Sequence, residues 1–126
     1  MTDLHAIGAA AKRAAYALAS ASTDQKNHAL KTIGAFLEAH VEDILSANAA
    51  DLEAARAGGM ATAMLDRLSL TPERVRAMAD GVRDVAKLPD PVGRVLSGST
   101  LPSGLEMEKI TVPLGVIGII FEARPN

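Results

Sequence analysis

Three polar residues at the end of the sequence have side chains that suit a negatively charged substrate. Glu122, Arg124 and Asn126 lie around Pro125, directly after a run of apolar residues. An arginine can form two parallel hydrogen bonds to a carboxylate or phosphate, and an asparagine amide can donate to a developing oxyanion. The same residues could instead form a turn held by an Arg–Glu ion pair. The sequence leaves both interpretations open.

The apolar run before these residues predicts a buried strand. Residues 115–121 (GVIGIIF) are rich in β-branched side chains, a pattern typical of a strand covered on both faces in a parallel sheet. Ligands bind beyond the carboxyl ends of strands in open α/β sheets, so such a strand would carry the polar residues to a site. No further strand follows, and we therefore expect the chain to hold only the first strand of a larger sheet.

The glycines of this run do not match a nucleotide-binding loop. Gly115 and Gly118 lie inside the expected strand instead of after it, and the full G-x-G-x-x-G pattern is absent. Close packing of the backbone within a sheet explains them better.

The other chemically versatile residues favour surface positions. His28 and His40 are twelve residues apart and His5 stands alone, so no pair has the spacing of metal ligands, and we expect no metal site. Glu106 and Glu108 could act as an acid–base pair, but alternate residues of a ribbon more simply form a solvated face. Cysteine is absent, which excludes disulfides, thiolate metal sites and a cysteine nucleophile within these 126 residues.

The first two-thirds of the sequence predicts helices, because apolar residues recur at spacings of three and four. Thr71, Pro72 and Glu73 form the clearest helix start, with a capping hydroxyl, a proline at the first position and a carboxylate in the first turn. Gly58-Gly59 is a typical helix stop. The expected helices cover residues 3–19, 22–40, 41–58, 60–68 and 71–88.

Two further expectations concern the middle of this helical segment. Leu30, Ile33, Phe36 and Leu37 share one face of the second expected helix and should point inward. Asn48 is expected to mark a break or bend in the third.

After Pro91 the pattern changes from helix to strand. Residues 92–101 and 105–112 predict two strands joined by a turn at 102–104 (PSG). Charged and apolar side chains mix on both faces of the second strand, which indicates a partly solvated ribbon. We therefore divide the chain into a helical segment (1–91), a β-hairpin (92–112) and an incomplete strand with its following loop (113–126).

The composition narrows the class of function. Apolar residues make up 48% of the 126 residues, charged residues 22%, and the formal net charge is -2, as expected of a folded domain. This balance leaves no excess of Lys and Arg for binding nucleic acid or an anionic membrane. No segment has the form of a signal peptide or is long enough to cross a bilayer. A cytoplasmic location is the resulting expectation.

Three segments carry a resemblance to a known family: residues 64–68 (MLDRL), 88–93 (LPDPVG) and, most specifically, 112–126 (VPLGVIGIIFEARPN). The sequence resembles the N-terminal part of the γ-glutamyl phosphate reductases, members of the aldehyde dehydrogenase superfamily. The resemblance implies an α/β parent fold. Within it, this chain would contribute mostly α-helices, a β-hairpin and the first strand of a parallel sheet.

The resemblance also implies an activity. These enzymes use NADPH to reduce γ-glutamyl phosphate to glutamate 5-semialdehyde with release of phosphate, a step of proline biosynthesis. A cysteine thiolate of the family attacks the acyl phosphate, and hydride then reduces the resulting thioester. Because this chain has no cysteine, we expect it to be inactive alone.

Individual residues receive roles through the same resemblance. Arg124 aligns with the oxyanion asparagine of the superfamily, so either Arg124 stabilises the charge of the acyl phosphate or Asn126 serves through a rearranged loop. The hairpin resembles the arm with which these enzymes form homo-oligomers, and its unpaired edges suit that use. The residues expected to approach the NADPH cofactor are Ile120, Phe121, Glu122 and Ala123.

A second class of function also fits the residues. A helical unit with an exposed hairpin could be a non-catalytic module that assembles with itself or with a partner. A complete small nucleotide-binding protein is disfavoured, because a phosphate loop and further strands are missing. One observation separates an enzyme part from an assembly module: an open reading frame that continues past residue 126 and encodes a cysteine supports the enzyme.

Overall fold

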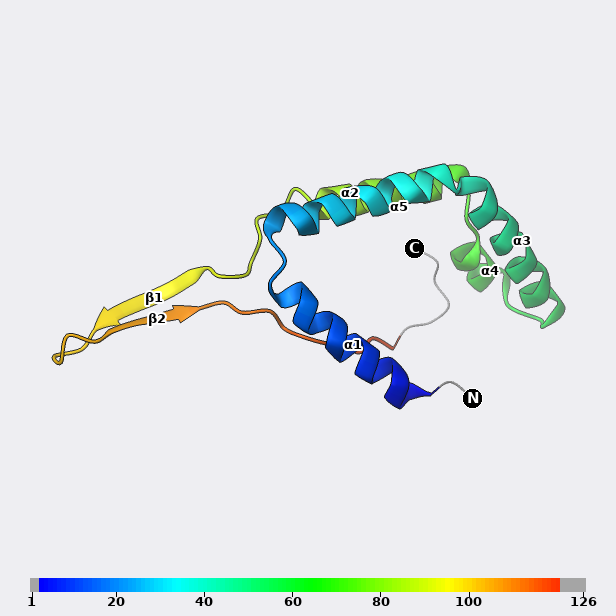
Figure 1. The fold of residues 1–126 in the computed structure, drawn as a ribbon. Helices are drawn as coiled ribbons and strands as arrows, with labels where there is room; N and C mark the ends of the chain where they lie inside the picture. Colours follow the sequence, from blue (N-terminus) through cyan, green and yellow to red (C-terminus); the bar gives the residue numbers. More distant parts are fainter. Residues whose placement is uncertain (1–2, 121–126) are drawn as a thin grey trace. The chain divides into compact units, whose positions relative to one another are not determined.

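The computed structural model describes residues 3–120, and these residues form helices followed by one hairpin (Figure 1). No helix among them is long and apolar enough to cross a membrane. The elements in chain order are α1 (Leu4–Ala19), α2 (Thr23–Ala39), α3 (Val41–Ala57), α4 (Thr62–Leu68), α5 (Pro72–Val85), β1 (Val95–Thr100) and β2 (Glu106–Ile110).

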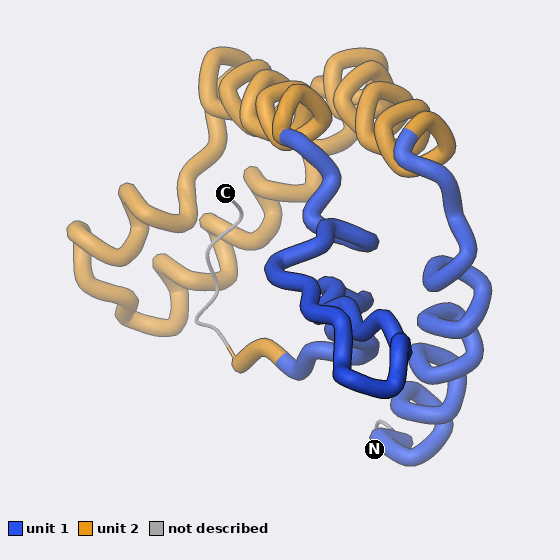
Figure 2. The backbone as a smooth tube through the Cα atoms, turned by 90° about the vertical axis from the view of Figure 1, so that its left-hand side faces the viewer, with its two compact units in different colours: residues 1–23, 89–118 blue, residues 24–88, 119–126 orange. Residues whose placement is uncertain are grey.

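The backbone divides into two compact units (Figure 2). The first unit, coloured blue, contains residues 1–23 and 89–118, and thus α1 and the hairpin. The second, coloured orange, contains residues 24–88 and 119–126, and thus nearly all of α2 together with α3, α4 and α5.

In the first unit, α1 is a well-capped helix with nothing buried against it. The carboxylate of Asp3 accepts hydrogen bonds from the backbone N–H groups of His5 (2.9 Å) and Ala6 (3.1 Å), which satisfies two of the free donors at the helix start. No residue of α1 is buried, and Leu4 and Leu18 of its apolar stripe are exposed.

The hairpin of the first unit confirms the expected pair of strands and its mixed faces. β1 and β2 pair antiparallel from Val95↔Ile110 to Thr100↔Glu106, with an irregular register between Val95 and Ser97. Gly104 has a positive φ of 84° in the connecting turn, a conformation that glycine adopts without strain. Every residue of both strands is exposed.

Thr111 holds the base of the hairpin together. Its hydroxyl accepts a hydrogen bond from the N–H of Arg94 (2.9 Å) and donates to the carbonyl of Pro91. Its backbone carbonyl accepts from the N–H of Gly93 (2.9 Å). These bonds tie the two ends of the hairpin to each other where the ladder of β1 and β2 has already ended.

In the second unit, α2 and α5 come into close contact and lie side by side in Figure 1. Val75 and Ala79 of α5 are fully buried, and Gly34 of α2 is buried opposite Ala79. A Cβ atom at position 34 would lie 3.3 Å from the carbonyl oxygen of Ala79, closer than an ordinary contact. The absence of a side chain at Gly34 therefore allows the two helix backbones to approach.

Asn48 does not interrupt α3, so the expected break is wrong. The helix is continuous, and the Asn48 side chain is only 5% exposed. Its amide donates to the carbonyl of Leu68 (2.9 Å) and accepts from the N–H of Leu70 (2.8 Å), which fastens the end of α4 to the middle of α3. A polar residue here satisfies backbone groups that would otherwise be buried without partners.

The helix signals near α5 are confirmed. Thr71 is the N-cap, with its hydroxyl accepting from the N–H of Arg74 (3.2 Å), and Pro72 is the first residue of the helix. The Arg74 guanidinium turns back to the loop before α5 and donates to the carbonyls of Asp66 (2.7 Å) and Ser69 (2.6 Å).

The expected strand at 115–121 is not formed. Residues 113–120 have no regular secondary structure, and Phe121 lies outside the described residues. A strand exists only when its backbone groups pair with a neighbour, and β1 and β2 pair only with each other. The apolar side chains of this segment are exposed instead, including Leu114 (88%) and Ile117 (63%).

Candidate functional site

The polar cluster expected to carry the chemistry lies outside the described residues. This holds for both candidates for the oxyanion, Arg124 and Asn126, and for Phe121, Glu122 and Ala123 of the expected cofactor set. Ile120 is the one member of the expected site that the structure describes. The site and the turn considered for residues 122–126 are therefore both untested.

Ile120 does not form a nicotinamide pocket by itself. Its side chain is fully exposed, so no neighbouring group covers it. A dinucleotide site needs a surface that shields the nicotinamide from water and donors that hold the phosphates. One described residue cannot test such a site, and the assignment of residues 120–123 to NADPH stays a prediction.

Two shallow grooves lie on the outer face of α2. One has a volume of about 460 Å³ and the other about 360 Å³, and they share Thr32, Phe36 and His40. The Phe36 and His40 rings, which line both grooves, stack with their centroids 5.3 Å apart. The other lining residues are His28, Lys31, Ala35 and Ala39 in the larger groove, and Ile33, Leu37 and Ile44 in the smaller.

The grooves correct one expectation about α2. Leu30 and Leu37 are half-buried, as the apolar stripe predicts, but Ile33 (49%) and Phe36 (63%) are exposed. The buried face of α2 is centred on Gly34, which carries no side chain and so gives no signal in a hydrophobic pattern. A glycine in the middle of a helix was the only sequence feature that could have marked the contact face.

The histidines do not come together. His5 and His28 are exposed, and the ring of His40 pairs with the carboxylate of Asp43 (Nδ1 to Oδ2, 3.0 Å). Among residues 3–120, no three histidine, aspartate or glutamate side chains are arranged to hold a metal ion. Glu106 and Glu108 are exposed on β2, in agreement with a solvated face.

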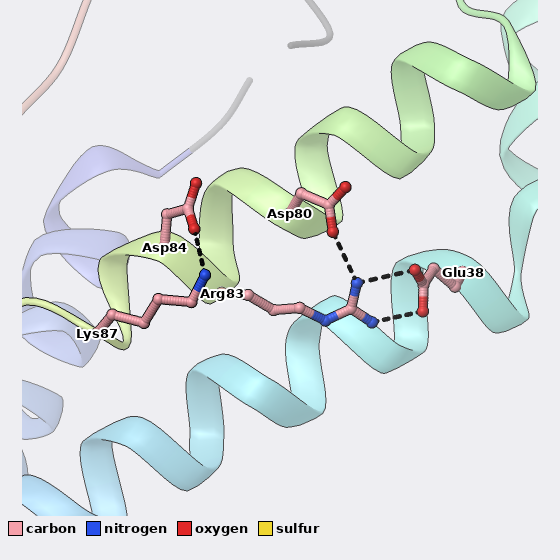
Figure 3. Close-up of polar contacts among 5 residues, drawn as sticks. All are labelled: Glu38, Asp80, Arg83, Asp84 and Lys87. Carbon is pink, nitrogen blue, oxygen red and sulfur yellow. Dashed lines mark hydrogen bonds and ion pairs between the residues drawn. The ribbon is translucent and has the colours of Figure 1, made fainter.

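The densest cluster of charge joins α2 and α5 (Figure 3). The Arg83 guanidinium donates to both carboxylate oxygens of Glu38, at 2.8 and 2.5 Å, and to one oxygen of Asp80 at 3.1 Å. A planar guanidinium and a carboxylate pair in this two-pronged way more strongly than single ion pairs do. In the turn directly after α5, Lys87 donates to Asp84 at 2.7 Å.

Arg83 and Glu38 each shift the ionisation of the other in the direction that favours charge. The hydrogen bonds that Arg83 donates hold the pKa of the Glu38 carboxyl below its ordinary value, and the Glu38 and then the Asp80 carboxylates, by accepting them, raise the pKa of Arg83. The hydrogen bond to Asp84 likewise raises the pKa of Lys87. All these groups are paired with one another, so the arrangement serves as a clamp between helices and does not resemble an acid or base poised for catalysis.

Arg83 also explains the glycine opposite it. Its Cγ and Nε atoms would each lie 3.4 Å from a Cβ atom at position 34, so the arginine stem passes over Gly34 on its way to Glu38. Helical side chains lean toward the N-terminus of their helix, which also brings Arg83 close to Asp80. The residues involved are 45 positions apart in sequence, and no local pattern predicts their pairing.

No family model matches the sequence, but individual relatives do. The gamma-glutamyl phosphate reductase of Salmonella dublin is 57% identical over 123 residues, which cover 98% of this chain and 30% of the relative. That of Salmonella newport is 56% identical over the same length and share.

Solved structures agree with these relatives. The gamma-glutamyl phosphate reductase of Thermotoga maritima superposes with a TM-score of 0.79 at 35% identity, over 82% of this chain and 25% of that one. The enzyme of Saccharomyces cerevisiae gives a TM-score of 0.81 at 33% identity, over 90% of this chain and 29% of that one. The chain is a homologue of gamma-glutamyl phosphate reductase that spans about 30% of the length of the curated relatives it matches.

Proposed function

We propose that this chain functions as part of an NADPH-dependent reductase that converts γ-glutamyl phosphate to glutamate 5-semialdehyde with release of phosphate. The observation that carries the proposal is the identity of 57% across 98% of the chain, shared with a protein named for that reaction. A role in proline biosynthesis and a cytoplasmic location belong to the same proposal.

The exposed segment 114–120 supports a role inside a larger structure. Leu114, Val116, Ile117, Ile119 and Ile120 are all exposed on consecutive or nearly consecutive positions. Fully burying each such side chain stabilises a protein by roughly 1.5–3 kcal/mol. The described residues do not bury these side chains and so do not gain this stabilisation. We infer that the segment becomes a strand when further strands pair with it, in the first position of an α/β sheet.

The helical unit also offers apolar surface that its own residues do not cover. Ile33 and Phe36 of α2 are exposed, whereas Gly34 of the same helix lies against α5. Contiguous apolar surface of this kind is uncommon on an isolated soluble protein and usually marks a contact with other protein. Residues 1–91 would then be the N-terminal helical segment of the cofactor domain in the longer enzyme.

The proposed chemistry divides between this chain and the rest of the enzyme. NADPH, when bound, supplies the hydride. Residues 120–123 would line its nicotinamide end, and either Arg124 or Asn126 would stabilise the negative charge on the acyl oxygen. The thiolate that attacks the acyl phosphate cannot come from this chain, which has no cysteine. We therefore propose that the chain alone is inactive.

The hairpin would serve assembly. All eleven residues of β1 and β2 are exposed, and the outer edges of both strands have no partner among the described residues. Such an edge is a template for pairing with another strand. We propose that it joins copies of the longer enzyme into a homo-oligomer.

A hybrid enzyme tests the proposal. The matching 123 residues of the Salmonella dublin reductase are replaced by those of this chain, and NADP-dependent turnover is measured with glutamate 5-semialdehyde and phosphate in the reverse direction. Turnover by the hybrid, and none by the isolated chain, would support the proposal. A well-folded hybrid of native mass without turnover would contradict it.

The same preparations separate the enzyme from the alternative of an assembly module. An assembly module predicts that the isolated chain unfolds cooperatively and has one defined oligomeric mass. A reductase part predicts that a defined mass appears only in the hybrid, because the hairpin and segment 114–120 find their partners there. Analytical ultracentrifugation of both proteins distinguishes these outcomes.

A further inference from the structure

We draw no further inference here: the strongest candidate, the pair of apolar grooves on the outer face of α2 around Phe36 and His40, carries nothing because the structure does not show what covers it.

Discussion

The α2–α5 contact and the segment 113–120 are both rich in apolar residues, yet only the first is packed. Ala79 of α5 is fully buried beside Gly34 of α2, whereas Ile117 and Ile119 are largely exposed. The helices α2 and α5 pack within residues 24–88, and the backbone hydrogen bonds of each helix are internal to it. A parallel strand needs neighbouring strands both to bury its side chains and to pair its backbone N–H and C=O groups. This requirement explains why segment 113–120, although more apolar, is the less structured region.

The largest expected effect comes from a charge in the exposed segment. Ile117→Asp should leave the urea denaturation of the isolated chain unchanged, because the side chain is already in contact with water. In the hybrid enzyme the same change would bury an unpaired carboxylate, and we expect turnover to fall by more than tenfold. Ser46→Asp at an exposed position of α3 is the control and should have little effect on either protein. If Ile117→Asp destabilised the isolated chain as much as the hybrid enzyme, Ile117 would not differ in burial between the two proteins.

The packed region should respond most strongly at Asn48. Asn48→Ala removes two hydrogen bonds and leaves the carbonyl of Leu68 and the N–H of Leu70 without their partner. We expect the free energy of unfolding to fall by about 2–4 kcal/mol, measured by urea denaturation with circular dichroism. Ser46→Ala, at an exposed position of the same helix, should change it by less than about 0.5 kcal/mol. Similar values for both variants would show that Asn48 does not fasten α4 to α3.

A side chain at Gly34 should separate α2 from α5. Gly34→Val places its Cβ within 3.3 Å of a backbone oxygen that cannot move freely, and overpacking of this kind costs about 1–3 kcal/mol. Gly81 of α5 provides a matched control, because no atom lies within 4 Å of a Cβ built there. Gly81→Val should be neutral or slightly stabilising, since valine forms helix better than glycine. Equal destabilisation by the two changes would count against close packing at position 34.

The smallest effect is expected at the Arg83 clamp, and it depends on pH. Glu38 has a folded-state pKa below its ordinary value of 4.5, so its contribution to stability is present above that pH and lost as the pH falls through the lower, folded value. Glu38→Gln should therefore lower the stability slightly at neutral pH and flatten its acid dependence. Glu53→Gln, at an exposed position of α3, is the control. If Glu38→Gln left the acid dependence of the free energy of unfolding unchanged, the ion pair of Glu38 with Arg83 would not stabilise the α2–α5 contact.

The features predicted correctly from sequence are those that a few adjacent residues determine. Thr71 and Pro72 start α5 through a hydroxyl cap and a fixed φ, and Gly59 follows the end of α3 with a positive φ of 76°. The hairpin turn at 102–104 is also determined locally, because Gly104 adopts the left-handed region without strain. Strand ends differ by a few residues from the expected limits, because pairing and not composition decides where a strand stops.

The features that sequence analysis missed depend on residues far apart in the chain. From its residue type Asn48 suggests a helix break, but its side chain bonds Leu68 at the end of α4 and Leu70 just after it, 20 and 22 residues away. The apolar pattern places Phe36 in a core, but the contact face of α2 is set by Gly34 and by Arg83 of another helix. The strand expected at 115–121 also depends on distant residues. It is not formed, because no strand among the described residues pairs with it.

Amide hydrogen exchange of residues 115–120 distinguishes an unpaired segment from a strand. We expect rapid exchange of these backbone N–H groups in the isolated chain, where the segment pairs with no strand, and strong protection in the hybrid enzyme, where it joins a sheet. Protection of the same groups in the isolated chain, to the level of α5, would contradict this expectation.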